Sequence, residues 1–87
     1  MNSHTILFYA TTWCYDCRMA RNILDKNKIP YQYINIDEDP AAAQYVMSVN
    51  RGYRSVPTIV FSDGTFLVEP GRDELLQKLE ELEYLAA

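Results

Sequence analysis

The chain has 87 residues, of which 48% are hydrophobic and 23% charged, and its formal net charge is −4. This length predicts one domain over residues 1–87, with enough apolar side chains for one core, which excludes a disordered chain. No basic run points to nucleic acid as a partner, and no apolar run approaches the roughly 20 residues of a membrane-spanning helix.

The first half of the chain predicts a strand, a helix and a second strand. Residues 5–10 are β-rich and nearly all apolar, as in a central strand that is buried on both faces. A helical pattern follows and ends at Pro30. Residues 31–36 alternate well enough for a second strand, which a right-handed crossover places parallel to the first.

The second half predicts a helix, a β-hairpin and a last helix. Asp39 before Pro40 is typical of a helix N-cap followed by proline at the first helical position. A turn signal at residues 62–65 separates two β-rich runs. The expected elements here are a helix at 41–49, strands at 58–61 and 66–68, and a helix at 73–84. The fold class is therefore α/β, with a mixed four-stranded sheet (βαβ, then a β-hairpin) and three flanking helices on both faces.

Both cysteines of the chain, Cys14 and Cys17, lie between the first strand and the first helix. Two cysteines with two residues between them at a strand-to-helix turn form a redox couple in many small proteins. N–H groups at the helix N-terminus favour a thiolate on the first cysteine, and the second lies one turn further along. The first apolar run is too short for a signal peptide, so we expect a cytoplasmic protein, where such pairs are more often catalytic than structural.

Other interpretations of the two cysteines are weaker. A tetrahedral zinc site needs four ligands, and the chain has no further cysteine and only one histidine, His4, so zinc would require a second chain. A structural disulfide gains little from closing so small a loop. Two incidental thiols would not explain the position at a strand-to-helix turn. We therefore predict a redox pair and no metal site.

These features resemble the glutaredoxin branch of the thioredoxin fold over nearly the whole chain. The resemblance rests on the cysteine pair after the first strand, on Ser-Val-Pro at residues 55–57, and on a glycine–aspartate pair near the last helix. The likeness to the mycoredoxin-type subgroup is closer, because of Trp13, the alanines at 41–43, the stretch at 48–50 and Arg54. It implies a thiol-disulfide oxidoreductase without a bound cofactor, whose co-substrate is a low-molecular-weight thiol, glutathione or mycothiol.

The resemblance also implies roles for single residues. Cys14 would be the nucleophile and Cys17 the resolving thiol. Val56 would pair its backbone with an extended thiol ligand, and Pro57, in a cis bond, would face Cys14. The other residues implied to bind the small thiol or shape its groove are Thr12, Trp13, Tyr15, Gln44, Arg54, Gly71 and Asp73.

Three of these residues have simpler interpretations beside the implied ones. Gln44 stands where a family glutamine contacts the glycyl carboxylate of glutathione, but it would also suit an exposed helix position. Arg54 would add charge near a ligand, or be a solvated loop residue. Asp73 matches the aspartate that meets the γ-glutamyl amine, and it would also help to cap the last helix.

The chain departs from the family pattern at three places. Tyr15-Asp16 replaces the Pro-Tyr pair between the cysteines, Thr11 replaces a common lysine, and Pro70-Gly71 replaces Gly-Gly. The missing lysine and the altered glycine pair weaken the case for glutathione itself as the ligand. They leave thiol-disulfide exchange intact, because exchange needs only the two cysteines and their turn.

Two other functions stay open. One is a redoxin that thioredoxin reductase reduces and that donates electrons to ribonucleotide reductase; its Trp-Ser-Gly-Phe-Arg-Pro stretch is missing from residues 68–73. The other is a dimer that holds an iron–sulfur cluster or zinc through Cys14, although its usual glycine is replaced by Tyr15. We expect a monomer, with small thiols, disulfide-containing proteins and, in the redoxin case, thioredoxin reductase as partners.

Overall fold

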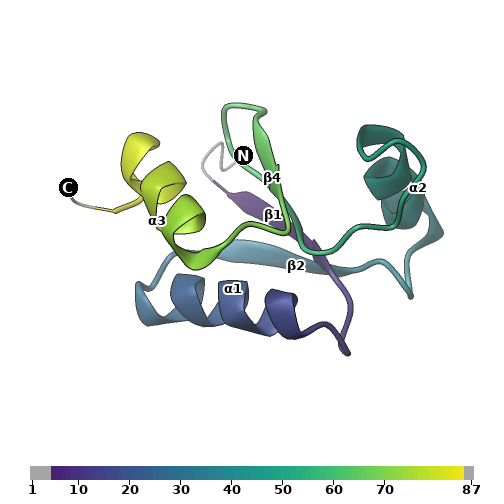
Figure 1. Cartoon of the computed structure of the whole chain (residues 1–87), viewed down its shortest axis with the longest axis horizontal. Helices are drawn as coiled ribbons and strands as arrows, with labels where there is room; N and C mark the ends of the chain where they lie inside the picture. Colours follow the sequence, from purple (N-terminus) through teal and green to yellow (C-terminus); the bar gives the residue numbers. More distant parts are fainter. Residues whose placement is uncertain (1–4, 86–87) are drawn as a thin grey trace.

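Residues 5–85, which the computed structural model describes, form four strands and three helices in the predicted order (Figure 1). The elements are β1 (Ile6–Ala10), α1 (Tyr15–Lys26), β2 (Tyr31–Asn35), α2 (Pro40–Val49), β3 (Thr58–Val60), β4 (Phe66–Val68) and α3 (Arg72–Glu81). His4, considered above as a zinc ligand, lies outside the described residues.

The four strands form one mixed sheet in the order β2-β1-β3-β4. β1 runs parallel to β2, with Ile6 opposite Tyr31, and antiparallel to β3, with Phe8 opposite Ile59. β3 and β4 are the antiparallel hairpin that the turn signal predicted. The predicted sheet is thus confirmed, and β1 is a central strand whose side chains are mostly buried.

Successive side chains of β1 point to opposite faces of the sheet, so both faces carry apolar groups. Helices cover both of these faces. The ring of Phe8 lies 5.5 Å from that of Tyr31, whose hydroxyl accepts a hydrogen bond from Arg21 of α1 at 3.2 Å. The ring of Tyr9 lies 5.1 Å from that of Tyr45 of α2. α3 packs beside α1. The largest fully buried hydrophobic side chains are Phe8, Ile6, Leu24, Ile59, Leu75 and Leu79.

The helix ends follow from local chemistry. Asp39 is the N-cap of α2, as predicted, and its side chain accepts a hydrogen bond from the Ala42 N–H at 3.0 Å. The prediction of a last helix over residues 73–84 was wrong at its end, since α3 stops at Glu81. Glu83 adopts a left-handed backbone (φ 66°), and the N–H of Tyr84 turns back to donate to the Leu79 carbonyl at 2.8 Å.

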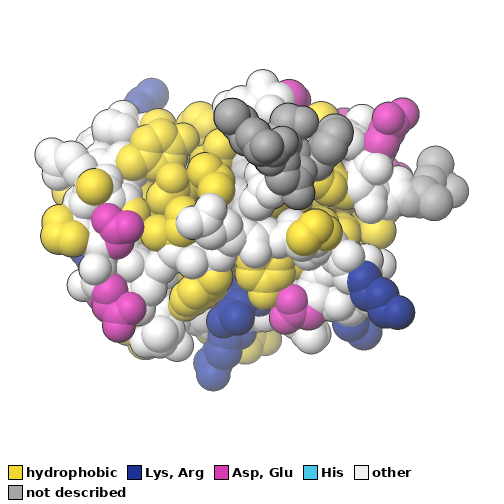
Figure 2. All heavy atoms as spheres, turned by 180° about the vertical axis from the view of Figure 1, so that it is seen from behind, with side chains coloured by type: hydrophobic (Ala, Val, Ile, Leu, Met, Phe, Trp, Pro, Cys, Tyr) yellow, Lys and Arg dark blue, Asp and Glu magenta, His cyan; other side chains and the backbone are white. Residues whose placement is uncertain are grey.

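The surface mixes apolar and charged groups. Seen from behind, hydrophobic side chains gather on the side of the molecule that carries α2, at the upper left of Figure 2, with acidic groups among them. Within residues 5–85, no helix combines the length and the apolar character that a bilayer crossing would need.

Candidate active site

Cys14 is the N-cap of α1. Its Sγ accepts a hydrogen bond from the backbone N–H of Cys17 at 3.1 Å, and its carbonyl accepts one from the N–H of Arg18 at 3.2 Å. The sulfur therefore lies at the end of the helix where N–H groups have no carbonyl partner within the helix. Such a position favours a negative charge, which is what a reactive thiolate needs.

Cys17 lies in the first turn of α1 and faces the core. Its exposed fraction is 1%, against 8% for Cys14, and both cysteines are free thiols. Burial, and after it a hydrogen bond with the Cys14 side chain, raises the pKa of the Cys17 thiol from 9.0 to about 12, while the Thr11 backbone acts in the opposite direction. Cys17 is therefore protonated at neutral pH, and Cys14 is the more exposed of the two cysteines.

The loop before β3 faces this pair. The thiol of Cys14 donates a hydrogen bond to the Val56 carbonyl at 3.7 Å, and the bond between Val56 and Pro57 is cis. Pro57 is fully buried and Val56 nearly so. The structure thus brings together Cys14, Cys17 and Val56-Pro57 from segments that lie far apart in the chain.

Trp13 and Arg54 meet at a residue that the sequence analysis missed. The Trp13 Nε1 donates to Oδ2 of Asp37 at 3.1 Å, and the Arg54 Nη2 donates to Oδ1 of the same carboxylate at 2.6 Å. The signal for Asp37 was its place just after the second parallel strand. The loops that follow β1 and β2 leave the sheet at one edge, at the right of Figure 1.

The remaining predicted residues are exposed. Thr12 and Tyr15 flank the Trp13–Cys14 pair, Gln44 lies on α2, and Gly71 is the N-cap of α3. The Asp73 side chain is 98% exposed and lies 3.8 Å from the Arg72 guanidinium. Within residues 5–85, no hydrogen bond or ion pair joins Gln44, Gly71 or Asp73 to either cysteine. Their roles toward a ligand stay predictions.

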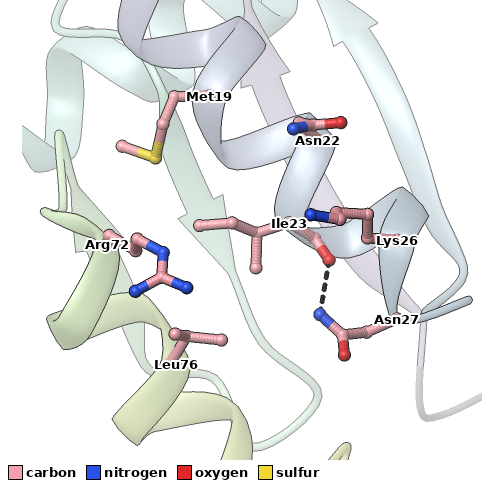
Figure 3. Close-up of a pocket in the computed structure, with 7 residues that line it drawn as sticks. All are labelled: Met19, Asn22, Ile23, Lys26, Asn27, Arg72 and Leu76. Carbon is pink, nitrogen blue, oxygen red and sulfur yellow. Dashed lines mark hydrogen bonds between the residues drawn. The ribbon is translucent and has the colours of Figure 1, made fainter.

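A groove of about 410 Å³ lies between α1 and α3. Figure 3 shows apolar side chains of both helices facing each other across it, with polar and basic groups at its sides. Its lining residues are Met19, Asn22, Ile23, Lys26, Asn27, Arg72 and Leu76. It contains neither cysteine nor any residue predicted for the site. Across residues 5–85, no group of three or more metal-ligating side chains is assembled.

Comparison with protein families and curated proteins gives one consistent result. The family model described as glutaredoxin matches residues 6–67. A Mycobacterium tuberculosis protein described as a glutaredoxin is 40% identical over 79 residues, covering 91% of this chain and 94% of its own. Mycoredoxin 1 of Corynebacterium glutamicum is 42% identical over 77 residues, covering 88% and 95%. The glutaredoxin-like protein NrdH of Lactococcus lactis is 31% identical over 61 residues, covering 70% and 82%.

Solved structures confirm the thioredoxin-like fold. A glutaredoxin from Archaeoglobus fulgidus superposes with a TM-score of 0.70 at 25% identity, covering 92% of this chain and 86% of that one. The thioredoxin-like protein BC3987 gives 0.71 at 28% identity, covering 86% and 99%. A buckwheat glutaredoxin–glutathione complex gives 0.65 at 25% identity, covering 94% and 74%.

Proposed function

Because this chain belongs to the glutaredoxin family of thiol-disulfide oxidoreductases, we propose that it reduces mixed disulfides between proteins and a small thiol, with Cys14 as nucleophile. One observation carries the assignment of the nucleophile: Cys14 Sγ caps α1 and accepts the Cys17 N–H at 3.1 Å. A thiolate formed there keeps that hydrogen bond and gains from the helix dipole.

The reaction runs in two exchange steps. The Cys14 thiolate attacks the small thiol's sulfur, a Cys14–S bond forms, the substrate's S–S bond breaks, and the released protein thiolate takes a proton. The thiolate of a second small thiol then attacks the sulfur of the small thiol bound to Cys14, so that the two small thiols leave as a disulfide and Cys14 leaves as a thiolate. With protein disulfides, Cys17 instead attacks the Cys14 sulfur of the mixed disulfide, the second substrate thiolate leaves, and small thiols then reduce the Cys14–Cys17 disulfide that has formed. The Cys17 pKa of about 12 means that this thiol must lose its proton as the new bond forms.

We favour a mycothiol-type co-substrate over glutathione. The 42% identity to mycoredoxin 1 supports this choice, and so does the local charge. Thr11 replaces the family lysine, and Arg54 is already paired with Asp37, so little positive charge is offered to the two carboxylates of glutathione. Mycothiol, a sugar-linked cysteine derivative, has no free carboxylate.

The other roles are proposed in the same way. A ligand joined to Cys14 would lie along Val56, whose carbonyl already meets the Cys14 thiol, and would pair with that backbone as an added strand. Thr12, Tyr15, Gln44, Gly71 and Asp73 would complete the groove. We place the chemistry in the cytoplasm, where a reducing thiol pool is available, and on a monomer of one domain.

One comparison of rates tests the proposal. A peptide that carries a mixed disulfide with mycothiol and the same peptide carrying glutathione are offered to the reduced protein, and the released peptide thiol is measured. We expect release from both, faster for mycothiol, and none with Cys14→Ser. A parental protein that releases no peptide thiol from either substrate would overturn the proposed function.

A redoxin served by thioredoxin reductase is the second candidate, favoured by the 31% identity to NrdH. It predicts that thioredoxin reductase with NADPH reduces the Cys14–Cys17 disulfide directly. Oxidation of NADPH without any small thiol present would support this candidate. If no NADPH is oxidised, the small-thiol pathway remains as the proposed function.

A further inference from the structure

Asp37 joins segments that lie far apart in the chain. Its two carboxylate oxygens accept hydrogen bonds from Trp13 and from Arg54, at 3.1 Å and 2.6 Å. Its own backbone N–H donates to the Asn35 side chain at 2.9 Å, which fixes the turn after β2. The carboxylate therefore ties the loop before α1 to the loop before β3.

Both tied residues adjoin the reacting sulfur. Trp13 directly precedes Cys14, and Arg54 comes two residues before Val56, whose carbonyl accepts the Cys14 thiol at 3.7 Å. By holding both side chains, Asp37 fixes the opening between the nucleophile and the backbone edge along which a ligand would lie.

The same contact decides which charge a ligand meets. The Arg54 and Asp37 side chains are 48% and 41% exposed, so a ligand at this edge can reach the pair. The carboxylate offsets the guanidinium charge at short range. Arg54 therefore attracts a ligand carboxylate less than an unpaired arginine would.

We propose that Asp37 is a positioning residue that sets the thiol selectivity of Cys14: by occupying Arg54 and holding Trp13, it disfavours thiols that carry carboxylates relative to uncharged thiols. The inference rests on the proposed reduction of small-thiol mixed disulfides and assigns its selectivity to one side chain.

The test compares one peptide carrying a mixed disulfide with glutathione, which has two carboxylates, or with 2-mercaptoethanol, which has none. Asp37→Asn keeps the side chain's size and releases Arg54. We expect the ratio of rates, glutathione over 2-mercaptoethanol, to rise about threefold, as suits an exposed ion pair. Asp37→Glu should keep the parental ratio. Glu38→Gln, which removes the same charge from the neighbouring exposed residue, is the matched control and should also leave it unchanged.

Two further measurements separate positioning from general stability. In an Arg54→Gln background, Asp37→Asn should no longer change the ratio, because no guanidinium remains to be released. Trp13 is the chain's one tryptophan, so its fluorescence reports the contact directly and should change in Asp37→Ala but not in Glu38→Gln.

Each failure has its own meaning. A ratio unchanged in Asp37→Asn, raised equally in Glu38→Gln, or still raised without Arg54 would overturn the selectivity role. Fluorescence unchanged in Asp37→Ala would overturn the hold on Trp13. A parental protein that is inert toward both peptides would instead overturn the proposed function.

Discussion

The sheet edge around Cys14 and the groove between α1 and α3 share one helix but differ in what they offer. The groove is hollow, at about 410 Å³, yet its lining contains no nucleophile. The edge holds the Cys14 sulfur, the proposed nucleophile, at the N-terminus of α1, near the loops that carry Val56 and Asp37. A search by concavity alone would choose the groove. Thiol-disulfide exchange needs a thiol, and the end of the helix carries one beside its first backbone N–H groups while its flank carries none.

Cys14→Ser is expected to have the largest effect on activity of all the variants. A serine hydroxyl is far less acidic and less nucleophilic than a thiol, so we expect no reduction of small-thiol or protein disulfides above the uncatalysed rate. The measurement is release of peptide thiol, with circular dichroism as the check on the fold. Activity retained in this variant would place the nucleophile elsewhere in the chain.

Cys17→Ser distinguishes the roles of the two cysteines at this edge. With small-thiol mixed disulfides a second small thiol resolves Cys14, so this variant should keep much of its activity, within a few-fold of the parental rate. With protein disulfides the variant should lose turnover, because a thiol held in place attacks faster than a dissolved one.

A covalent complex is the signature of that loss. Cys17→Ser mixed with a disulfide-containing protein should give a band on a non-reducing gel that disappears with reductant, and Cys14→Ser should give none. Equal loss of both activities in Cys17→Ser, with the fold intact, would favour the redoxin served by thioredoxin reductase.

Much of this site could be predicted because its signals are local. The spacing of Cys14 and Cys17 after an apolar run predicted the redox pair, and Asp39 before Pro40 predicted the start of α2. The end of α3 was misjudged, because Leu82 continues the apolar spacing while the left-handed turn at Glu83 stops the helix.

Asp37 shows where sequence reasoning fails. Its place just after the second strand marks the turn, but nothing in the sequence distinguishes Asp37 from Glu38 within a run of three acidic residues. Its partners, Trp13 and Arg54, lie 24 and 17 residues away, and only the pairing of β1 with both β2 and β3 brings them together. Contacts of this kind depend on the packed sheet, so no local pattern predicts them.

The burial of Cys17 predicts a dependence of stability on pH. Its pKa is raised from 9.0 to about 12 in the folded chain, so the unfolded chain loses this proton first as the pH rises. Stability from Cys17 is thus complete below pH 9 and is lost between about pH 9 and 12. Between pH 8 and pH 10 the free energy of unfolding of the reduced protein should fall by about 1 kcal/mol more than that of Cys17→Ser.

Chemical denaturation at pH 8 and pH 10, with both proteins fully reduced, gives this difference. Tyr9, whose pKa burial also raises, is present in both proteins and cancels in the comparison. Burial also raises the pKa of Tyr33, and the charge on Cys17 adds to that rise, so the Tyr33 contribution belongs to the measured Cys17 effect. An equal loss in the two proteins would mean that Cys17 is not held as a buried neutral thiol.

The smallest effect is expected from a substitution in the groove, which tests whether the groove takes part in the reaction. Lys26→Gln removes a cation that lines the groove in the last turn of α1. The change should cost roughly 0.3–0.5 kcal/mol of stability through the helix dipole. It should leave the rates with both small-thiol mixed disulfides unchanged, since Lys26 lies at the opposite end of α1 from Cys14. If the rate falls while the stability loss stays within this range, the groove is part of the active site. The groove and the helix end around Cys14 would then not be functionally separate.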